Sequence, residues 1–245
     1  MNFIVQGIQW IFDPARWSGP GDIQSRILEQ LAYTFGAVAI AAVIAIPVGL
    51  LIGHTGKGRD VAVSLSGGLR ALPSLGLLII FALLIGIGFK APLLAFVILA
   101  IPPVLSGAYA GIEAVDKRTV DAARAMGMTE WRVLTKVEVP LGAPLIVAGI
   151  RSGVLQVVAT ATLAYFASGG ALGVFIDDGL ATRNYVELLG ASIVVTALAL
   201  ILEGIFALAQ RLIVPRGVTA GQVKDVRTRP VRSRSTMGSP IQEGK

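Results

Sequence analysis

The sequence predicts an all-α polytopic membrane protein with about five transmembrane helices. Hydrophobic residues make up 54% of the 245-residue chain and charged residues only 15%, and the mean hydropathy is +0.76. A soluble domain carries about 25% charged residues, so this chain has too few polar side chains to cover a core of its own. The apolar residues also gather into stretches of the length that a helix needs to cross a bilayer, about 20 residues.

Five stretches qualify as spans: Leu31–Gly53, Leu72–Phe89, Pro92–Ile112, Leu141–Phe166 and Val186–Val214. Residues 1–30 hold only a short apolar run near Trp10 and Trp17, so we expect an interfacial segment at the headgroup level. This segment lacks a basic start and does not resemble a cleavable signal peptide. Residues 31–215 are then the transmembrane domain.

Proline and the small residues shape the predicted spans. Pro73 opens the second span, where the missing N–H of a first helical turn costs nothing. Pro102 and Pro103 lie in the middle of the third span and predict a kink or a break there. Glycine and alanine recur throughout the spans and let helices approach closely in lipid, which predicts a compact bundle.

The positions of the basic residues predict the orientation. If residues 113–139 form a cytoplasmic loop, the opposite side of the membrane keeps only Arg16, Arg26, Lys90 and Arg183. Basic residues gather on the cytoplasmic side of membrane proteins, so we expect the N-terminus outside and the C-terminus inside. Residues 216–245 are rich in Arg, Ser, Gly and Pro and are expected to form a disordered, basic cytoplasmic tail.

Few residues suit catalysis or metal binding. The chain has no cysteine, and its single histidine, His54, is expected to be a solvated residue of a polar loop. Residues 53–58 contain a Gly-Lys pair but lack the spacing and the Ser or Thr of a Walker A loop. We therefore expect a transport subunit that is not an enzyme and binds no cofactor, with ATP and Mg²⁺ held by another chain.

The segment between the third and fourth spans carries the most specific pattern. Gly127 is placed to end one short helix in a left-handed conformation, and Thr129 to cap a second. The second helix is expected to carry Trp131, Leu134 and either Val137 or Glu138 along one side, and Pro140 to mark the turn into the fourth span. The first helix is expected to present a small-residue surface suited to a partner's groove, formed by Ala122, Ala123 and Ala125.

This segment resembles the EAA motif of type I ABC-importer permeases, with the pattern E-A-A-x3-G-x9-I-x-L-P. The matching positions are Asp121, Ala122, Ala123, Gly127, Val137, Val139 and Pro140, with Asp replacing Glu and Val replacing Ile and Leu. The resemblance implies a MetI-like architecture, in which residues 113–139 form a coupling loop that docks on a cytoplasmic ATPase subunit. An ordinary amphipathic loop between spans is the alternative.

A narrower resemblance, over residues 30–215, points to permeases of the glycine betaine/choline/carnitine/proline class of osmoprotectant importers. It rests on residues 70–75, 148–151 and 159–173, parts of which amino-acid permeases share. It implies a bacterial inner-membrane protein that pairs with a second copy or a paralogue. Two ATPase subunits and an extracytoplasmic substrate-binding protein would complete the importer.

Arg151 and Glu203 are charged residues within apolar spans. Because an unpaired charge in a membrane is costly, we expect them to pair, with Glu113 as a third candidate partner. The alternative is that Arg151 lines the transport pathway. Asp177 and Asp178 are expected to be loop carboxylates that are solvated or contact a binding protein.

Three rival functions remain open at the level of the sequence. The first is a permease of the same architecture for methionine or another amino acid. The second is an ion-coupled secondary transporter that uses Arg151 and Glu203 as a relay, a class that often shows inverted repeats, and none is found in this chain. The third is a membrane scaffold without transport activity.

Overall fold

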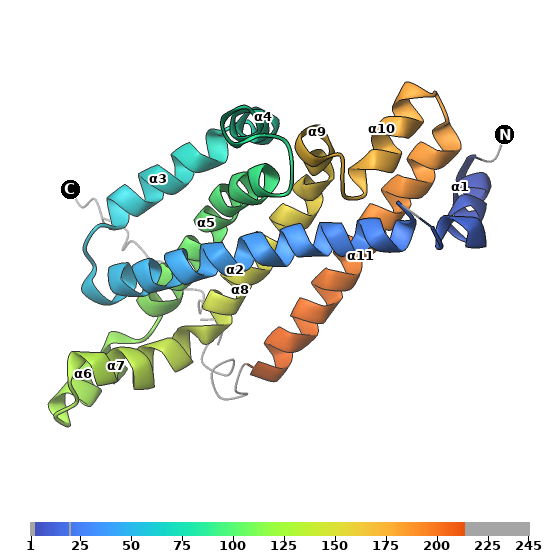
Figure 1. Cartoon of the computed structure of the whole chain (residues 1–245). Helices are drawn as coiled ribbons and strands as arrows, with labels where there is room; N and C mark the ends of the chain where they lie inside the picture. The colour runs from blue at the N-terminus through green and yellow to red at the C-terminus, as the bar shows by residue number, and fades with distance from the viewer. Residues whose placement is uncertain (1–2, 20, 214–245) are drawn as a thin grey trace, which may run out of the picture. The chain divides into compact units, whose positions relative to one another are not determined.

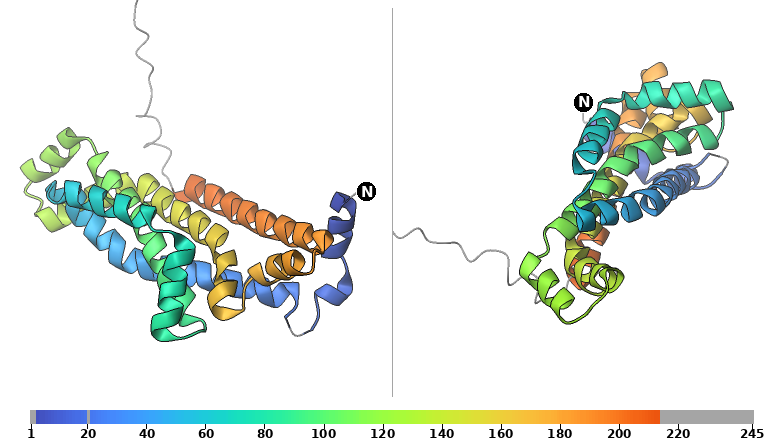
Figure 2. Two further views of the ribbon diagram at one scale, coloured as in Figure 1. Left: turned by 90° about the horizontal axis from the view of Figure 1, so that it is seen from above. Right: turned by 90° about the vertical axis from the view of Figure 1, so that its left-hand side faces the viewer.

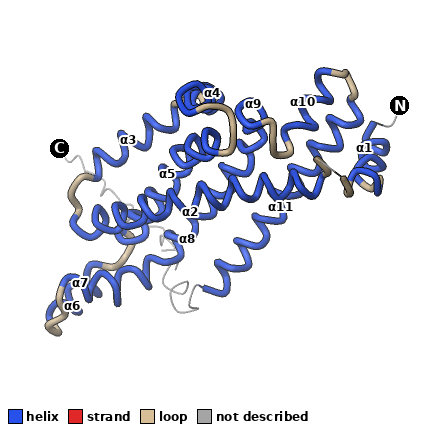
Figure 3. The backbone as a smooth tube through the Cα atoms, in the orientation of Figure 1, coloured by secondary structure: helices blue, strands red, loops and turns tan. Residues whose placement is uncertain are grey.

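The computed structural model describes residues 3–19 and 21–213, and these form helices and turns without a strand (Figures 1 and 3). For residues 211–213 the description covers the backbone alone. The tail predicted to be disordered, residues 216–245, lies outside the described residues. An all-helical chain suits a bilayer, because a helix satisfies its own backbone hydrogen bonds.

Four helical runs are long and apolar enough to cross a membrane. They comprise α2 (Ile23–Thr55), α5 (Lys90–Glu113), the run that contains α8 (Val139–Thr160), and α11 (Tyr185–Ile213). A fifth crossing is formed if α3 (Arg59–Ala71) and α4 (Ser74–Ile85), which meet at a bend of 84°, count as one broken span. Four to five crossings agree with the number that hydropathy predicts.

The structure differs from the prediction at the start of the first span and in the polar stretch that follows it. Helix α2 begins at Ile23, eight residues before the predicted start at Leu31, because the side chain of Asp22 accepts a hydrogen bond from the Ser25 N–H (2.8 Å) and caps the helix. The polar stretch after the first span contains the helix α3, and Pro73 is the residue that precedes α4. Hydropathy locates the lipid-facing part of a helix and does not register a capping residue or a short amphipathic helix.

Helices α2, α5 and α8 form the core of the bundle, with α5 between the other two. A methyl group added at Gly107 of α5 would lie 2.5 Å from the Cα atom of Gly149 in α8, and one at Gly142 would lie 2.5 Å from the Gly111 carbonyl oxygen. The two backbones therefore touch along this seam, as small residues allow in membranes. We call these four glycines the α5–α8 seam.

The prolines of α5 do not break the helix. Pro102 and Pro103 are both buried, and α5 is assigned as one helix from Lys90 to Glu113. The predicted break is therefore wrong, and the kink that was its alternative stays a prediction. Packing against α2 and α8 holds the helix together where the proline N–H groups are missing, which is how membrane helices commonly tolerate proline.

The N-terminal helix α1 (Phe3–Ile11) packs on α11. Trp10 is buried with its ring against Gly190 and edge-on to Phe175, 5.5 Å between centroids. Ile4 and Phe12 remain exposed on the same segment. Helix α1 lies at one end of the bundle, and α6 (Lys117–Ala125) and α7 (Glu130–Val133) lie at the other (Figures 1 and 2).

Candidate functional site

Residues 114–138, which we call the α6–α7 segment, connect α5 to α8. Helix α6 begins after Asp116, whose side chain accepts a hydrogen bond from the Arg118 N–H (2.9 Å). Gly127 has a φ of +84°, a left-handed conformation that glycine adopts at little cost. Thr129 occupies the capping position of α7, although its side chain makes no capping bond. The helix–glycine–helix arrangement is the predicted one.

The predicted turn at Pro140 is absent. A π-helix, Leu134–Glu138, joins α7 to α8 directly, and the Val139 N–H donates to the Leu134 carbonyl. Pro140 has no N–H to complete the α-helical ladder, so the wider π turn lets the helix continue into α8. Trp131 is 70% exposed whereas Leu134 is buried, so the predicted row of these residues along one side is also wrong.

The α6–α7 segment has a small apolar core. Val115, Val120, Ala123 and Val133 are buried together, with Met128 and Val137 packed against them. Ala123 is therefore internal, and the predicted small-residue surface consists of Ala122 and Ala125 only. Of the other matched motif positions, Asp121, Gly127 and Pro140 are exposed and Val137 and Val139 are half-buried.

Two large exposed side chains accompany Ala122 and Ala125 on this segment. Met126 is 77% exposed and Trp131 is 70% exposed. Sequence analysis missed Met126 as a surface residue, although its place next to Gly127, at the tip between two helices, could have indicated it. We call Ala122, Ala125, Met126 and Trp131 the apolar tip.

Charged side chains hold α6 against α7. The guanidinium of Arg124 donates two hydrogen bonds to the Glu130 carboxylate, both of 2.9 Å, and also lies 3.4 Å from Asp121. The hydrogen bonds to Glu130 raise the pKa of Arg124 above its ordinary value. The pair bridges the turn at Gly127 and fixes the angle between the two short helices.

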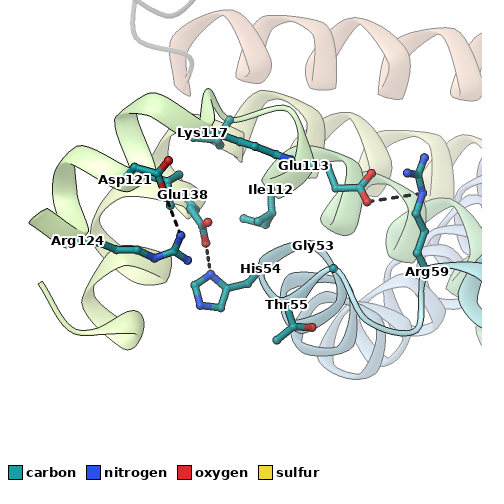
Figure 4. Close-up of a pocket in the computed structure, with 13 residues that line it drawn as sticks. Gly53, His54, Thr55, Arg59, Ile112, Glu113, Lys117, Asp121, Arg124 and Glu138 are labelled. Carbon is teal, nitrogen blue, oxygen red and sulfur yellow. Dashed lines mark hydrogen bonds and ion pairs between the residues drawn. The ribbon is translucent and has the colours of Figure 1, made fainter.

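His54 is not the solvated loop residue that the sequence predicts. Helix α2 continues to Thr55, which places the His54 side chain, 11% exposed, against the α6–α7 segment. Its Nδ1 atom lies 2.5 Å from the Glu138 carboxylate (Figure 4), and its Nε2 atom lies 3.1 Å from that of Glu130. The error arose because hydropathy ended the first span at Gly53, one residue too early to include the histidine.

A cavity of about 550 Å³ opens beside these contacts. Its walls come from the end of α2 and the start of α3 on one side, and from the end of α5 and α6 on the other (Figure 4). Glu113 lies here, 3.6 Å from Arg59, and is not the partner of Arg151 that it was considered to be. The cavity separates the turn after α2 from α6.

The structure brings Arg151 and Glu203 together. The Arg151 Nε atom donates to the Glu203 carboxylate (2.8 Å), which a second guanidinium nitrogen also contacts. Gln210, which sequence analysis did not select, accepts a further hydrogen bond from Arg151 (3.1 Å) and donates to the Pro144 carbonyl (3.3 Å). Helices α8 and α11 are thus joined by polar contacts within an apolar interface.

At the other end of the bundle, α2 clamps the glycine-rich turn that follows the fourth span. The Glu29 carboxylate accepts a hydrogen bond from the Ala171 N–H (2.7 Å), and buried Gln30 bonds both the Leu172 N–H (3.3 Å) and the Val158 carbonyl (2.8 Å). The sequence signal for this contact is the pair of adjacent polar residues, Glu29 and Gln30, directly before an apolar stretch. Asp177 and Asp178 lie on α10 (Gly173–Ala181) and not in a loop.

Comparison with known proteins identifies the family. Residues 45–217 match the family described as binding-protein-dependent transport system inner membrane component. The chain is 32% identical over 198 residues to the glycine betaine/carnitine/choline transport system permease protein OpuCB of Bacillus subtilis, covering 81% of this chain and 91% of that protein. It is 31% identical over 218 residues to the choline transport system permease protein OpuBB of the same species, covering 89% and 97%. It is 35% identical over 182 residues to the carnitine transport permease protein OpuCB of Listeria monocytogenes, covering 74% and 83%.

A solved structure shares the fold. An inward-facing MetNI methionine ABC transporter contains a chain that superposes with a TM-score of 0.70 at 20% identity, covering 79% of this chain and 96% of that one. The predicted MetI-like architecture is confirmed by this likeness. Together with the family match and the apolar helices, these findings show that the chain belongs to the binding-protein-dependent transport system inner membrane components and is a membrane-spanning permease of an ABC importer.

Proposed function

We propose that this permease imports a small osmoprotectant of the glycine betaine, choline or carnitine class, driven by ATPase subunits that dock on the α6–α7 segment. The observation that carries the docking site is the apolar tip. Exposed methionine and tryptophan side chains at the end of a bundle are typical of protein interfaces. The tip also lies on the segment whose sequence matches the coupling motif.

The local structure supports docking as a rigid unit. Gly127 sets the angle between α6 and α7, the Arg124–Glu130 pair holds that angle, and Ala122 and Ala125 allow a partner's backbone to come close. Closing of the ATPase pair on ATP would draw two such segments together and open the bundles to the outside. This chain would supply the binding surface, and ATP with Mg²⁺ would be held by the ATPase subunits.

The osmoprotectant class rests on the named relatives. Three relatives at 31–35% identity are permeases for choline, carnitine or glycine betaine. A zwitterionic or cationic quaternary ammonium compound is therefore the substrate that we propose, delivered by an extracytoplasmic binding protein to a pair of permease chains.

We further propose the orientation with α1 outside and the α6–α7 segment in the cytoplasm, on the basis of the basic-residue asymmetry. The chain has no native cysteine, so single cysteines report position without background. Lys57→Cys should be labelled only from the cytoplasmic side, and Asp178→Cys only from outside. The reverse pattern would overturn both the orientation and the docking proposal.

The function is tested by uptake in proteoliposomes that contain the permease, its ATPase subunits and the binding protein. Labelled glycine betaine, choline and carnitine are offered with ATP inside, and methionine serves as the competing substrate of the rival assignment. Met126→Asp should abolish uptake because a charge enters the docking surface, whereas Met126→Leu, which keeps the tip apolar, should retain it. Uptake of methionine alone, or uptake without ATP, would contradict the proposal.

Met126→Asp should also fail to retain the ATPase subunits during purification, while its thermal stability in detergent stays that of the wild type. Gly127→Asp tests the same surface through the backbone, since the left-handed conformation disfavours a side chain. If both variants retain the ATPase subunits and transport normally, the α6–α7 segment is not the docking site.

A further inference from the structure

We propose that His54 is a positioning residue for coupling: by bonding Glu138 and Glu130 at once, it fastens the end of α2 to the α6–α7 segment so that the two move together. This inference rests on the proposed docking of ATPase subunits on that segment. It assigns a role to a residue outside the coupling motif, which lies more than 60 positions before it in the sequence.

The contact of His54 with Glu138 is shielded, whereas Glu130 is an exposed partner. Its side chain is 11% exposed and that of Glu138 is 6% exposed, and the Nδ1–carboxylate distance is 2.5 Å. Glu138 is the buried charged residue of the π-helix, and the bond to His54 is the one that satisfies it within the described structure. A buried carboxylate without a partner is costly, so the pair resists separation.

Glu130 extends the connection from α2 into both short helices. Its Oε2 atom lies 3.1 Å from His54 Nε2, and its Oε1 and Oε2 atoms each accept one hydrogen bond from Arg124. Three side chains in contact therefore form a continuous path from α6 to α2, along which we expect a displacement of α6 to reach α2. The order along this path is Arg124, Glu130 and His54, with Glu138 bonded to the second ring nitrogen.

Apolar packing does not supply the same connection. The apolar core of the α6–α7 segment is formed by residues 115–137 and, among its described members, contains none from α2. Helix α2 packs instead on α5, where Gly53 lies against Ile112, and the cavity separates the turn after α2 from α6. Helix α2 also lies against the π-helix Leu134–Glu138, so His54 adds polar bonds at a contact that the apolar cluster does not reach.

Both ring nitrogens face carboxylate oxygens, so each contact needs a hydrogen atom. A neutral imidazole carries one N–H, and an imidazolium carries two. Two hydrogen atoms, carried by the ring or by the carboxyl groups, are therefore shared across the two contacts. Charged groups around it are Arg124 behind Glu130 and, across the cavity, Arg59, Glu113, Lys117 and Asp121.

Transport per ATP hydrolysed measures the coupling. In proteoliposomes with the complete transporter, His54→Leu should lower uptake per ATP by roughly tenfold, since bonds to charged groups change equilibria by that factor or more. Thr55→Ala is the matched control: Thr55 lies in the same helical turn, lines the same cavity and bonds its own helix at Leu51. This control should behave as the wild type.

A second variant gives a readout that a merely structural role would not change. In Glu138→Gln, the new amide can donate to one ring nitrogen of a neutral imidazole while the other N–H donates to Glu130. Uptake per ATP of Glu138→Gln should therefore stay close to that of the wild type, whereas Glu138→Leu, which cannot bond the ring, should lose about as much as His54→Leu. Because the two Glu138 variants share the same ATPase and binding protein, the difference between them isolates the contact.

A label at the end of α2 makes the test independent of the substrate. With Lys57→Cys in the cysteine-free chain, ATP binding should change the rate of maleimide labelling when His54 is present, and should leave it unchanged with His54→Leu. If the wild type shows no osmoprotectant uptake, the substrate assignment fails while the labelling still decides the inference. Uptake per ATP in His54→Leu within about twofold of the wild type would overturn it, since a factor of two is well below the change expected for a charged hydrogen bond. Equal labelling responses, or equal losses in Glu138→Gln and Glu138→Leu, would also overturn it.

Discussion

The α5–α8 seam and the α6–α7 segment are neighbours in sequence but are held together in opposite ways. In the seam, glycine backbones touch, and a methyl group at Gly107 would overlap the Gly149 Cα atom at 2.5 Å. In the segment, a few charged side chains and a small apolar cluster hold short helices, and large apolar side chains face outward. The comparison teaches that packing of backbones holds the bundle, whereas side-chain contacts hold the segment, which is the surface on which we propose that a partner docks.

The largest effect is expected in the seam. Gly107→Ala should destabilise the bundle by about 3 kcal/mol, because the helices must separate to admit the methyl group. Gly204→Ala in α11 is the matched control, since a methyl group there meets nothing within 4 Å. Thermal unfolding in detergent measures the difference, and equal melting temperatures would mean that the two backbones do not touch.

A smaller effect is expected at Arg151 and Glu203, which join α8 to α11 by side chains. These side chains are 27% and 34% exposed, so each single alanine variant should cost about 2 kcal/mol, less than the 3–5 kcal/mol of a fully buried pair. The double variant should recover part of the loss, and a double-mutant cycle isolates that coupling. Purely additive losses would show that the residues do not interact. A stable Arg151→Ala variant that transports nothing would instead favour the pathway role of Arg151.

The smallest effect on the bundle is expected from Arg124→Gln. Because Arg124 is exposed and bonds only within the α6–α7 segment, its loss should leave the melting temperature nearly unchanged. Hydrogen exchange should become faster in α6 and α7 alone. Arg118→Gln, a change at an exposed arginine of the same helix, should leave the exchange as it is. Faster exchange throughout the bundle would remove the distinction between the two regions.

Hydropathy predicted the spans well where lipid contact decides the residue type. The predicted third span, Pro92–Ile112, differs from α5 by two residues at its start and one at its end. Hydropathy did not predict α3 or the start of α2, because a short amphipathic helix and the Asp22 cap carry little hydropathy signal. The spacing of the motif residues located the α6–α7 segment in the sequence. The spacing does not reveal that Ala123 is buried and Ala122 exposed, because this depends on how the segment packs.

The contacts of His54 were beyond sequence reasoning for a different reason. Its partner Glu138 lies 84 positions away in the chain, so no local pattern joins them. The Arg151–Glu203 contact could be anticipated because both charges interrupt apolar spans, where an unpaired charge is costly. Glu138 lies in a polar segment and gave no such signal.

The α5–α8 seam has a mechanical consequence. The α6–α7 segment is joined at its two ends to α5 and α8, whose backbones touch. Because close contact prevents the two helices from sliding past each other, we expect a displacement of the segment to rotate α5 and α8 together. Helix α5, with 24 residues, is about 36 Å long, so a rotation of about 10° around its midpoint moves each end by roughly 3 Å. A displacement of a few ångströms at the proposed docking surface would then be matched at the opposite end of the helix.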